Sequence, residues 1–214
     1  MKLFIAIPSY TGNITAECML SVVGLMEVLN SELSTKTTLT IHSYNGDVAD
    51  ARNELVKAFM SSTCTHLLFV DDDMAFVPRD IVRMCADRTD AFGNPAVTAA
   101  LCPRRNTEGC AVDYTLHSPP VDETLYGTNG YASVDRVGTG IMFIPRAVFE
   151  HVKPNAVVRR RDGLVQYFLR QTGVEDISED YAFCDLLKHC AVPLYIALWT
   201  DVKHIGRHAF GGFK

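Results

Sequence analysis

The stretch that decides the fold is HLLFVDDD, residues 66–73. Its first five residues are apolar apart from His66, and such a run predicts a strand buried on both faces, as in parallel sheets. Three acids, Asp71, Asp72 and Asp73, follow at once. Open α/β sheets bind ligands beyond the carboxyl ends of their strands, so the triplet is predicted to face a ligand.

On both sides of this stretch the sequence alternates between strand and helix patterns. Three successive pairs of a strand and a helix predict an α/β fold, with a doubly wound, mostly parallel sheet flanked by helices. After residue 101 the alternation stops, and residues 102–130 are rich in Gly, Pro and Asn. The predicted strands are residues 3–7, 38–44, 66–70, 96–101, 134–144 and 193–198, and the predicted helices are 15–30, 50–60, one starting at Pro78, and 179–188.

Composition and charge exclude some function classes. The chain has 214 residues, of which 48% are hydrophobic and 21% charged, as in a soluble folded domain rather than a disordered one. The formal net charge of -5 argues against a broad nucleic-acid surface, which needs clustered Lys and Arg. The run Arg159-Arg160-Arg161 is the exception, and it predicts a solvated turn, with binding of an anionic acceptor as the alternative.

Cysteine usage and hydropathy indicate the cellular compartment of the protein. Its seven cysteines are scattered and never spaced as CxxC, so neither a zinc site nor a disulfide framework is expected. This pattern favours a reducing, cytoplasmic location. The apolar stretch before Pro8 is too short for a signal peptide, and no later window predicts a membrane span.

The acidic triplet predicts a metal site. Adjacent carboxylates repel one another, and a divalent cation relieves that repulsion. Hard oxygen ligands suit Mn²⁺ or Mg²⁺ shared with substrate phosphates, so Asp71 and Asp73 are predicted to hold a metal beside a nucleotide diphosphate. The structural alternative is that the acids only end a strand and cap a helix. Arg52, near a predicted helix start, could meet a phosphate or stabilise the triplet.

Taken together, six motifs give the sequence a family resemblance. They are IAIPSY (residues 5–10), ADARNELV (49–56), HLLFVDDDM (66–74), VGTGIMFI (137–144), ISEDYAFC (177–184) and KHIG (203–206). In this order they resemble the GT-A glycosyltransferases, specifically the short family 2-like enzymes of phages and large DNA viruses. The resemblance covers nearly the whole chain. It implies a single domain, with a nucleotide-binding half at residues 1–101 and an acceptor-binding half at residues 102–214.

The resemblance also implies a donor site. The loop after the first strand would hold the nucleotide base and ribose, the acidic triplet and Arg52 would lie against the diphosphate, and a glycine-rich loop would lie beside the donor sugar and acceptor. The residues placed at the donor site in this way are Pro8, Ser9, Tyr10, Arg52, Asp71, Asp72, Gly138, Thr139 and Gly140.

Catalytic and further metal-binding roles follow from the same resemblance. Asp180 would be the general base that takes the proton of the acceptor hydroxyl, and Glu179 would position the acceptor. Acids in a first helical turn after Ser178 are also favourable for structure alone. His204 would be the third protein ligand of the metal, which favours Mn²⁺ over Mg²⁺, with His208 as the alternative.

The sequence therefore predicts a metal-dependent hexosyltransferase. It would move a sugar from a nucleotide diphosphate, UDP-linked, to a hydroxyl of a glycan or glycoprotein, with inversion at the anomeric carbon. One rival is a sugar-phosphate nucleotidyltransferase, but the loop Pro-Ser-Tyr-Thr-Gly-Asn (residues 8–13) lacks the basic residues usual in that class. The other rival is a non-catalytic module that binds nucleotide sugars or glycans.

Overall fold

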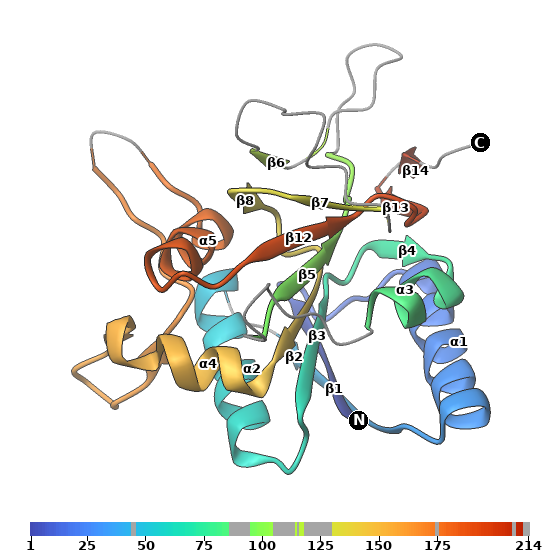
Figure 1. Cartoon of the computed structure of the whole chain (residues 1–214), viewed down its shortest axis with the longest axis horizontal. Coiled ribbons are helices and arrows are strands. Elements are labelled where there is room, and N and C mark those ends of the chain that lie inside the picture. Colours follow the sequence, from blue (N-terminus) through green and yellow to red (C-terminus); the bar gives the residue numbers. More distant parts are fainter. Residues whose placement is uncertain are drawn as a thin grey trace.

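The computed structural model describes residues 1–43, 46–85, 95–104, 114, 116–117, 130–173, 176–206 and 209–211. A seven-stranded sheet in the order β2-β1-β3-β9-β5-β12-β7 forms the centre of the molecule (Figure 1). The strands are β1 (Lys2–Ser9), β2 (Lys36–Ser43), β3 (His66–Val70), β5 (Val97–Ala100), β7 (Tyr131–Ser133), β9 (Ile141–Pro145) and β12 (Leu194–Ala197).

The sheet is mixed, but most of its strands run the same way. Both β2 and β3 are parallel to β1, and β12 is parallel to β5. Strand β9 lies between β3 and β5 and is antiparallel to both, while β7 is antiparallel to β12 at the edge. Five strands therefore share one direction, which confirms the predicted α/β fold with a mostly parallel sheet.

Helices cover both faces of this sheet. In Figure 1, α1 and α3 lie on one side, and α2, α4 and α5 lie on the other. Consecutive residues of β1 enter different core clusters: Leu3 and Ile5 pack with α1, whereas Phe4 and Ala6 pack with α2. Burial on both faces explains the continuous apolar runs. The helices are α1 (Ala16–Leu33), α2 (Val48–Ser61), α3 (Pro78–Met84), α4 (Arg146–Val152) and α5 (Glu179–His189), with a 3₁₀ turn at Lys153–Asn155.

Short-range sequence signals set where these helices begin. Thr15 accepts a hydrogen bond from the Cys18 amide at the start of α1, and Pro78 occupies the first turn of α3. Ser178 caps α5 in the same way by accepting from the Tyr181 amide. The predicted starts of these helices are thus confirmed, because the side-chain oxygen of Thr15 or Ser178 satisfies an amide that has no partner within the helix.

A small sheet brings the end of the described chain to the acidic triplet. It contains β4 (Met74–Phe76), β13 (Val202–Ile205) and β14 (Ala209–Gly211), in the order β14-β13-β4. Antiparallel pairing sets His204 opposite Met74, the residue that follows the triplet. Two short antiparallel pairs complete the described strands: β6 (Leu116–His117) with β8 (Arg136–Val137), and β10 (Val157–Val158) with β11 (Val165–Gln166).

Some predictions were wrong in detail. The single strand predicted over residues 134–144 is split into β8 and β9, and the segment 138–140 between them is not a strand. Helix α4 was not predicted. The last residue of the predicted strand 38–44, and most of the segment 102–130, lie outside the described residues.

The arginine run is only partly the solvated turn that we predicted. Arg160 and Arg161 are exposed in the turn between β10 and β11, which confirms the prediction for them. The Arg159 side chain is only 16% exposed and forms ion pairs with Asp50 at 2.8 Å and Asp162 at 2.6 Å. Arg159 therefore ties the β10–β11 hairpin to α2. No helix in the described part of the chain has the length and apolar character to cross a bilayer.

Candidate functional site

The acidic triplet lies where three segments meet at the carboxyl end of β3. The Asp71 amide donates to the Gly140 carbonyl at 2.8 Å, and the Ile205 amide donates to the Asp73 carbonyl at 2.8 Å. The Asp72 carbonyl accepts from the amide and hydroxyl of Thr15 at the start of α1. Main-chain contacts therefore fix the three residues, and their side chains are left to interact elsewhere.

Asp71 faces the interior, where it meets a buried arginine. Its two carboxylate oxygens accept from one terminal nitrogen of Arg52, at 2.9 and 3.2 Å. Burial raises the pKa of Asp71 to about 6, although the Arg52 charge acts in the opposite direction. The hypothesis that Arg52 stabilises the triplet is thus supported by direct contact.

Arg52 also reaches the acids at the start of α5. Its second terminal nitrogen donates to Glu179 at 2.5 Å and lies 3.6 Å from Asp180. Arg52 is 2% exposed, and its guanidinium lies 5.9 Å from the centre of the Phe168 ring. Burial lowers the pKa of Arg52, but the charges of the three carboxylates outweigh that effect and keep the group protonated.

The two α5 acids have different environments. Glu179 is 7% exposed, and burial together with the Asp180 charge raises its pKa to about 7. Burial also acts on Asp180 and raises its pKa, but the Arg52 charge, together with hydrogen bonds from Glu179 and from main-chain amides, lowers the pKa of Asp180 below its usual value. The Asp180 carboxylate is 18% exposed and accepts from the Thr139 amide at 3.3 Å. Asp180 is thus ionised, fixed and partly accessible near pH 7.

Asp73 points the other way, to His204. The His204 Nε2 atom lies 3.2 Å from an Asp73 oxygen, and Nδ1 lies 2.9 Å from the Pro103 carbonyl. A carbonyl can only accept, so Nδ1 must carry a proton. Nε2 then presents either a second proton or a bare lone pair to the carboxylate.

This pair presents two donor groups of the kinds that bind divalent metals. A histidine that donates through one ring nitrogen to a carbonyl, and presents the other beside a carboxylate, has the orientation usual in metal ligands. Oxygen and imidazole donors suit Mn²⁺. Among the described residues, no three His, Cys, Asp or Glu side chains are grouped to hold a metal without help. Asp73 and His204 would therefore need ligands from a substrate, and Asp71 is engaged by Arg52.

The residues predicted to bind the nucleotide lie along the same edge of the sheet, because β1 is parallel to β3. Pro8 and Ser9 are buried, whereas Tyr10 is 69% exposed. The Ser9 hydroxyl donates to the Asn13 carbonyl and accepts from the Gly12 amide, so it shapes the loop. Of these three residues, Tyr10 therefore has the side chain on which a base could stack.

The predicted glycine-rich loop reaches the site through β9. Because β9 is antiparallel to β3, the residues that enter it lie beside the residues that leave β3. A side chain added at Gly140 would lie 3.0 Å from the Cys102 sulfur. Gly138 is buried in the same loop, and the Thr139 hydroxyl is buried without a hydrogen-bond partner among the described residues.

Sequence reasoning missed one residue that supports the site. The Asn53 amide group donates to the Phe168 carbonyl at 2.7 Å, and its oxygen accepts from the amides of Tyr167 and Phe168 at 2.9 and 3.0 Å. These bonds hold Phe168 against Arg52. The signal was present in the motif ADARNELV, where a polar residue interrupts the apolar face of the helix.

His208, which was predicted as the alternative metal ligand, lies outside the described residues.

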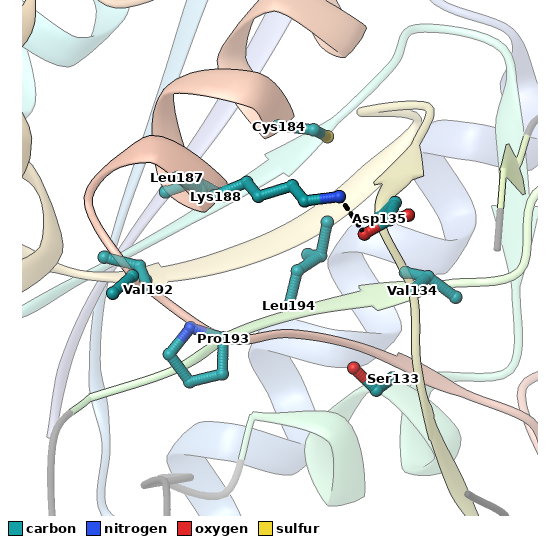
Figure 2. A pocket seen from close by; sticks show the side chains of 10 residues that line it. Ser133, Val134, Asp135, Cys184, Leu187, Lys188, Val192, Pro193 and Leu194 are labelled. Carbon is teal, nitrogen blue, oxygen red and sulfur yellow. Dashed lines mark hydrogen bonds and ion pairs between the residues drawn. The ribbon is translucent and has the colours of Figure 1, made fainter. Parts of the chain in front are cut away.

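A separate pocket of about 250 Å³ lies at the opposite edge of the sheet, between α5, β7 and the start of β12. Figure 2 shows Lys188 lying across it and pairing with Asp135, at 2.8 Å. The strands β12 and β3 run in the same direction. The pocket lies at Leu194, where β12 begins, whereas Asp71 follows the end of β3, so the pocket is distant from the acidic triplet.

The sequence matches no family model, and no curated protein is significantly similar to it. The structure does resemble solved structures. GalNAc-T7 with UDP, GalNAc and Mn²⁺ has a TM-score of 0.58 at 11% identity, over 95% of this chain and 43% of that one. A Drosophila β1,4-galactosyltransferase 7 mutant with manganese, UDP-Gal and xylobiose has a TM-score of 0.50 at 10% identity, over 92% of this chain and 65% of that one.

These likenesses concern the fold. The chain spans less than two thirds of the length of either enzyme, and identities of 10 and 11% do not carry residue roles from one protein to another. The seven-stranded mixed sheet, with its helices on both faces, is nonetheless similar to that of the GT-A glycosyltransferases, to which these two enzymes belong.

Proposed function

We propose that this protein is a metal-dependent glycosyltransferase. It transfers a hexose from a UDP-linked donor to a hydroxyl group of a glycan or glycoprotein, with inversion at the anomeric carbon. The resemblance of its motifs to family 2-like enzymes supports this proposal. The two structural neighbours, which contain UDP or UDP-Gal together with manganese, support it at the level of the fold.

One observation carries the proposal: two acidic groups with different partners lie at the same edge of the sheet. Asp73 pairs with His204, whereas Asp180 is held by Arg52 and the Thr139 amide. The first pair suits a metal that carries phosphates. The second presents an ionised carboxylate of the kind that deprotonates a hydroxyl.

The residues divide the chemistry between them. A divalent metal held by Asp73 and His204 would supply the positive charge that stabilises a departing diphosphate. Asp180 accepts the proton of the acceptor hydroxyl at its partly exposed carboxylate, which its lowered pKa keeps ionised near pH 7. Glu179, whose pKa is raised to about 7, is the stronger base, but its carboxylate is only 7% exposed and accepts from Arg52. The more exposed Asp180 is therefore the carboxylate within reach of an acceptor hydroxyl.

Isothermal calorimetry of UDP binding, with and without Mn²⁺, tests the metal site. Asp73→Ala should weaken Mn²⁺-dependent binding by more than about 10-fold, because even a group that only supports a metal ligand contributes 10 to 100-fold. Asp135→Ala is the matched control, because it removes one carboxylate at the opposite edge of the sheet. Equal affinities in the two variants, both folded by circular dichroism, would contradict the metal site. Transfer itself is tested by release of UDP from nucleotide sugars.

A further inference from the structure

We propose that Arg52 is a positioning residue, which holds the Asp180 base in place by linking the α5 acids to Asp71. This inference rests on the proposed function. It differs from the role that the resemblance implies, in which Arg52 would bind the donor directly.

The geometry of the guanidinium supports a bridge. One terminal nitrogen is occupied by both oxygens of Asp71, and the other by Glu179, with Asp180 at 3.6 Å. The two ends of the bridge come from β3 and α5, which are distant in the sequence. A planar guanidinium presents its donor arms in fixed directions and can hold two such groups in one geometry, whereas an ammonium is a compact point charge without that fork.

Burial argues against direct contact with a substrate. The Arg52 side chain is 3% exposed, compared with 27% for Asp71 and 18% for Asp180. The remaining nitrogen, Nε, is buried and has no hydrogen-bond partner among the described residues. Phe168, fixed by Asn53, lies against the guanidinium. Arg52 therefore acts on a substrate through the carboxylates that it holds, which are more exposed than it is.

Because Arg52 contacts both, the position of Asp71 and the positions of the α5 acids depend on each other. One cation is shared among three carboxylates, so any cation that attracts Asp71 competes with Arg52 for that residue. The guanidinium is then freer to interact with Glu179 and Asp180. Because the Thr139 amide holds Asp180 on its other oxygen, a firmer Arg52 contact restricts the carboxylate from two sides.

The substitution Arg52→Lys tests this bridge, because it keeps the positive charge and removes the fork. We expect kcat to fall by about 10²-fold, the usual effect of misplacing a catalytic group by 1 Å. The Kd for UDP with Mn²⁺ should stay within about threefold, because the lost contacts do not involve the donor. Arg79→Lys is the matched control, since Arg79 also binds a carboxylate, Glu32, with two nitrogens, but on the exposed surface.

The possible outcomes separate three roles for Arg52. If Arg52 were a donor ligand, Arg52→Lys would raise the Kd for UDP more than about tenfold and leave kcat at saturation unchanged. If Arg52 were purely structural, Arg52→Lys would lower the unfolding temperature without changing kcat or Kd. Either result would overturn the proposal. If Arg52→Lys fails to fold, the double variant Arg52→Gln with Glu179→Gln removes one charge of each sign and should show the same loss of kcat.

A measurement without turnover distinguishes failure of this bridge from failure of the proposed function. The Thr139 amide donates to Asp180, so its ¹H–¹⁵N chemical shift reports the position of that carboxylate. We expect the shift to change in Arg52→Lys and to stay constant in Arg79→Lys. A changed shift in a protein that transfers no sugar would retain the bridge and reject the function. An unchanged shift would reject the bridge whatever the activity.

Discussion

Replacing Asn53 with alanine should destabilise the fold by about 3–5 kcal/mol. The Asn53 side chain is fully buried, and it makes three hydrogen bonds of 2.7 to 3.0 Å with the main chain of Tyr167 and Phe168. Those two residues are 5% and 0% exposed. Alanine would leave two amides and one carbonyl buried without partners. Each such group costs about 1–3 kcal/mol, so three near the lower end of that range give about 3–5 kcal/mol. The total is a large part of the 5–15 kcal/mol typical of a folded domain.

Urea unfolding, followed by far-UV circular dichroism and by the fluorescence of the single tryptophan, Trp199, measures this loss. Lys57→Ala, one turn further along α2, is the control: its side chain is 64% exposed and pairs with Glu54 on the surface, and the change should stay within about 0.5 kcal/mol. A loss below about 1 kcal/mol in Asn53→Ala would refute the reasoning, because the segment would then find other partners.

Three further predictions concern the site and the fold. Asp180→Asn should lower turnover about 10²–10⁴-fold and leave UDP affinity unchanged in calorimetry, and near-normal turnover would reject Asp180 as the base. The pKa of Glu179 rises from 4.5 to about 7 on folding, so the stability that this group contributes is complete below pH 4.5 and is lost as the pH rises through 7. Urea unfolding at about pH 5 and about pH 8 should show a smaller decline in Glu179→Gln, and equal declines would contradict the shift. Gly130→Ala should cost about 2–4 kcal/mol in thermal unfolding, because φ is +77° and the new Cβ would lie 2.9 Å from Trp199; Gly173→Ala, with no atom within 4 Å, should change little.

The elements with strong local signals were predictable from the sequence. Helices α1 and α5 have caps at Thr15 and Ser178, and β1 and β3 have short apolar runs of the kind typical of strands buried on both faces. The direction of β9 was not predictable. An apolar run such as residues 141–144 has the same pattern in a parallel and an antiparallel strand, and its neighbours are set by pairing with β3 and β5.

The site was predictable as a set of residues but not as a set of contacts. Motifs located Asp71, Asp73, Glu179 and Asp180, since each follows a strand or starts a helix. Motifs do not give the direction of a side chain, so the engagement of Asp71 by Arg52, and of Asp73 by His204, required the structure. The predicted roles of these residues in binding and catalysis are still predictions.

The position of β9 in the middle of the sheet has a consequence for synthesis. The chain that emerges first contains β1, β2, β3 and β5, yet β3 and β5 meet only through β9, which is made later. Until then each has an unpaired edge of the kind that associates with other chains. Strand pairing between distant segments is also slow, because the intervening chain must first be closed into a loop. We therefore expect chains terminated before residue 141 to aggregate during translation, and we expect chaperones to raise the yield of the intact protein.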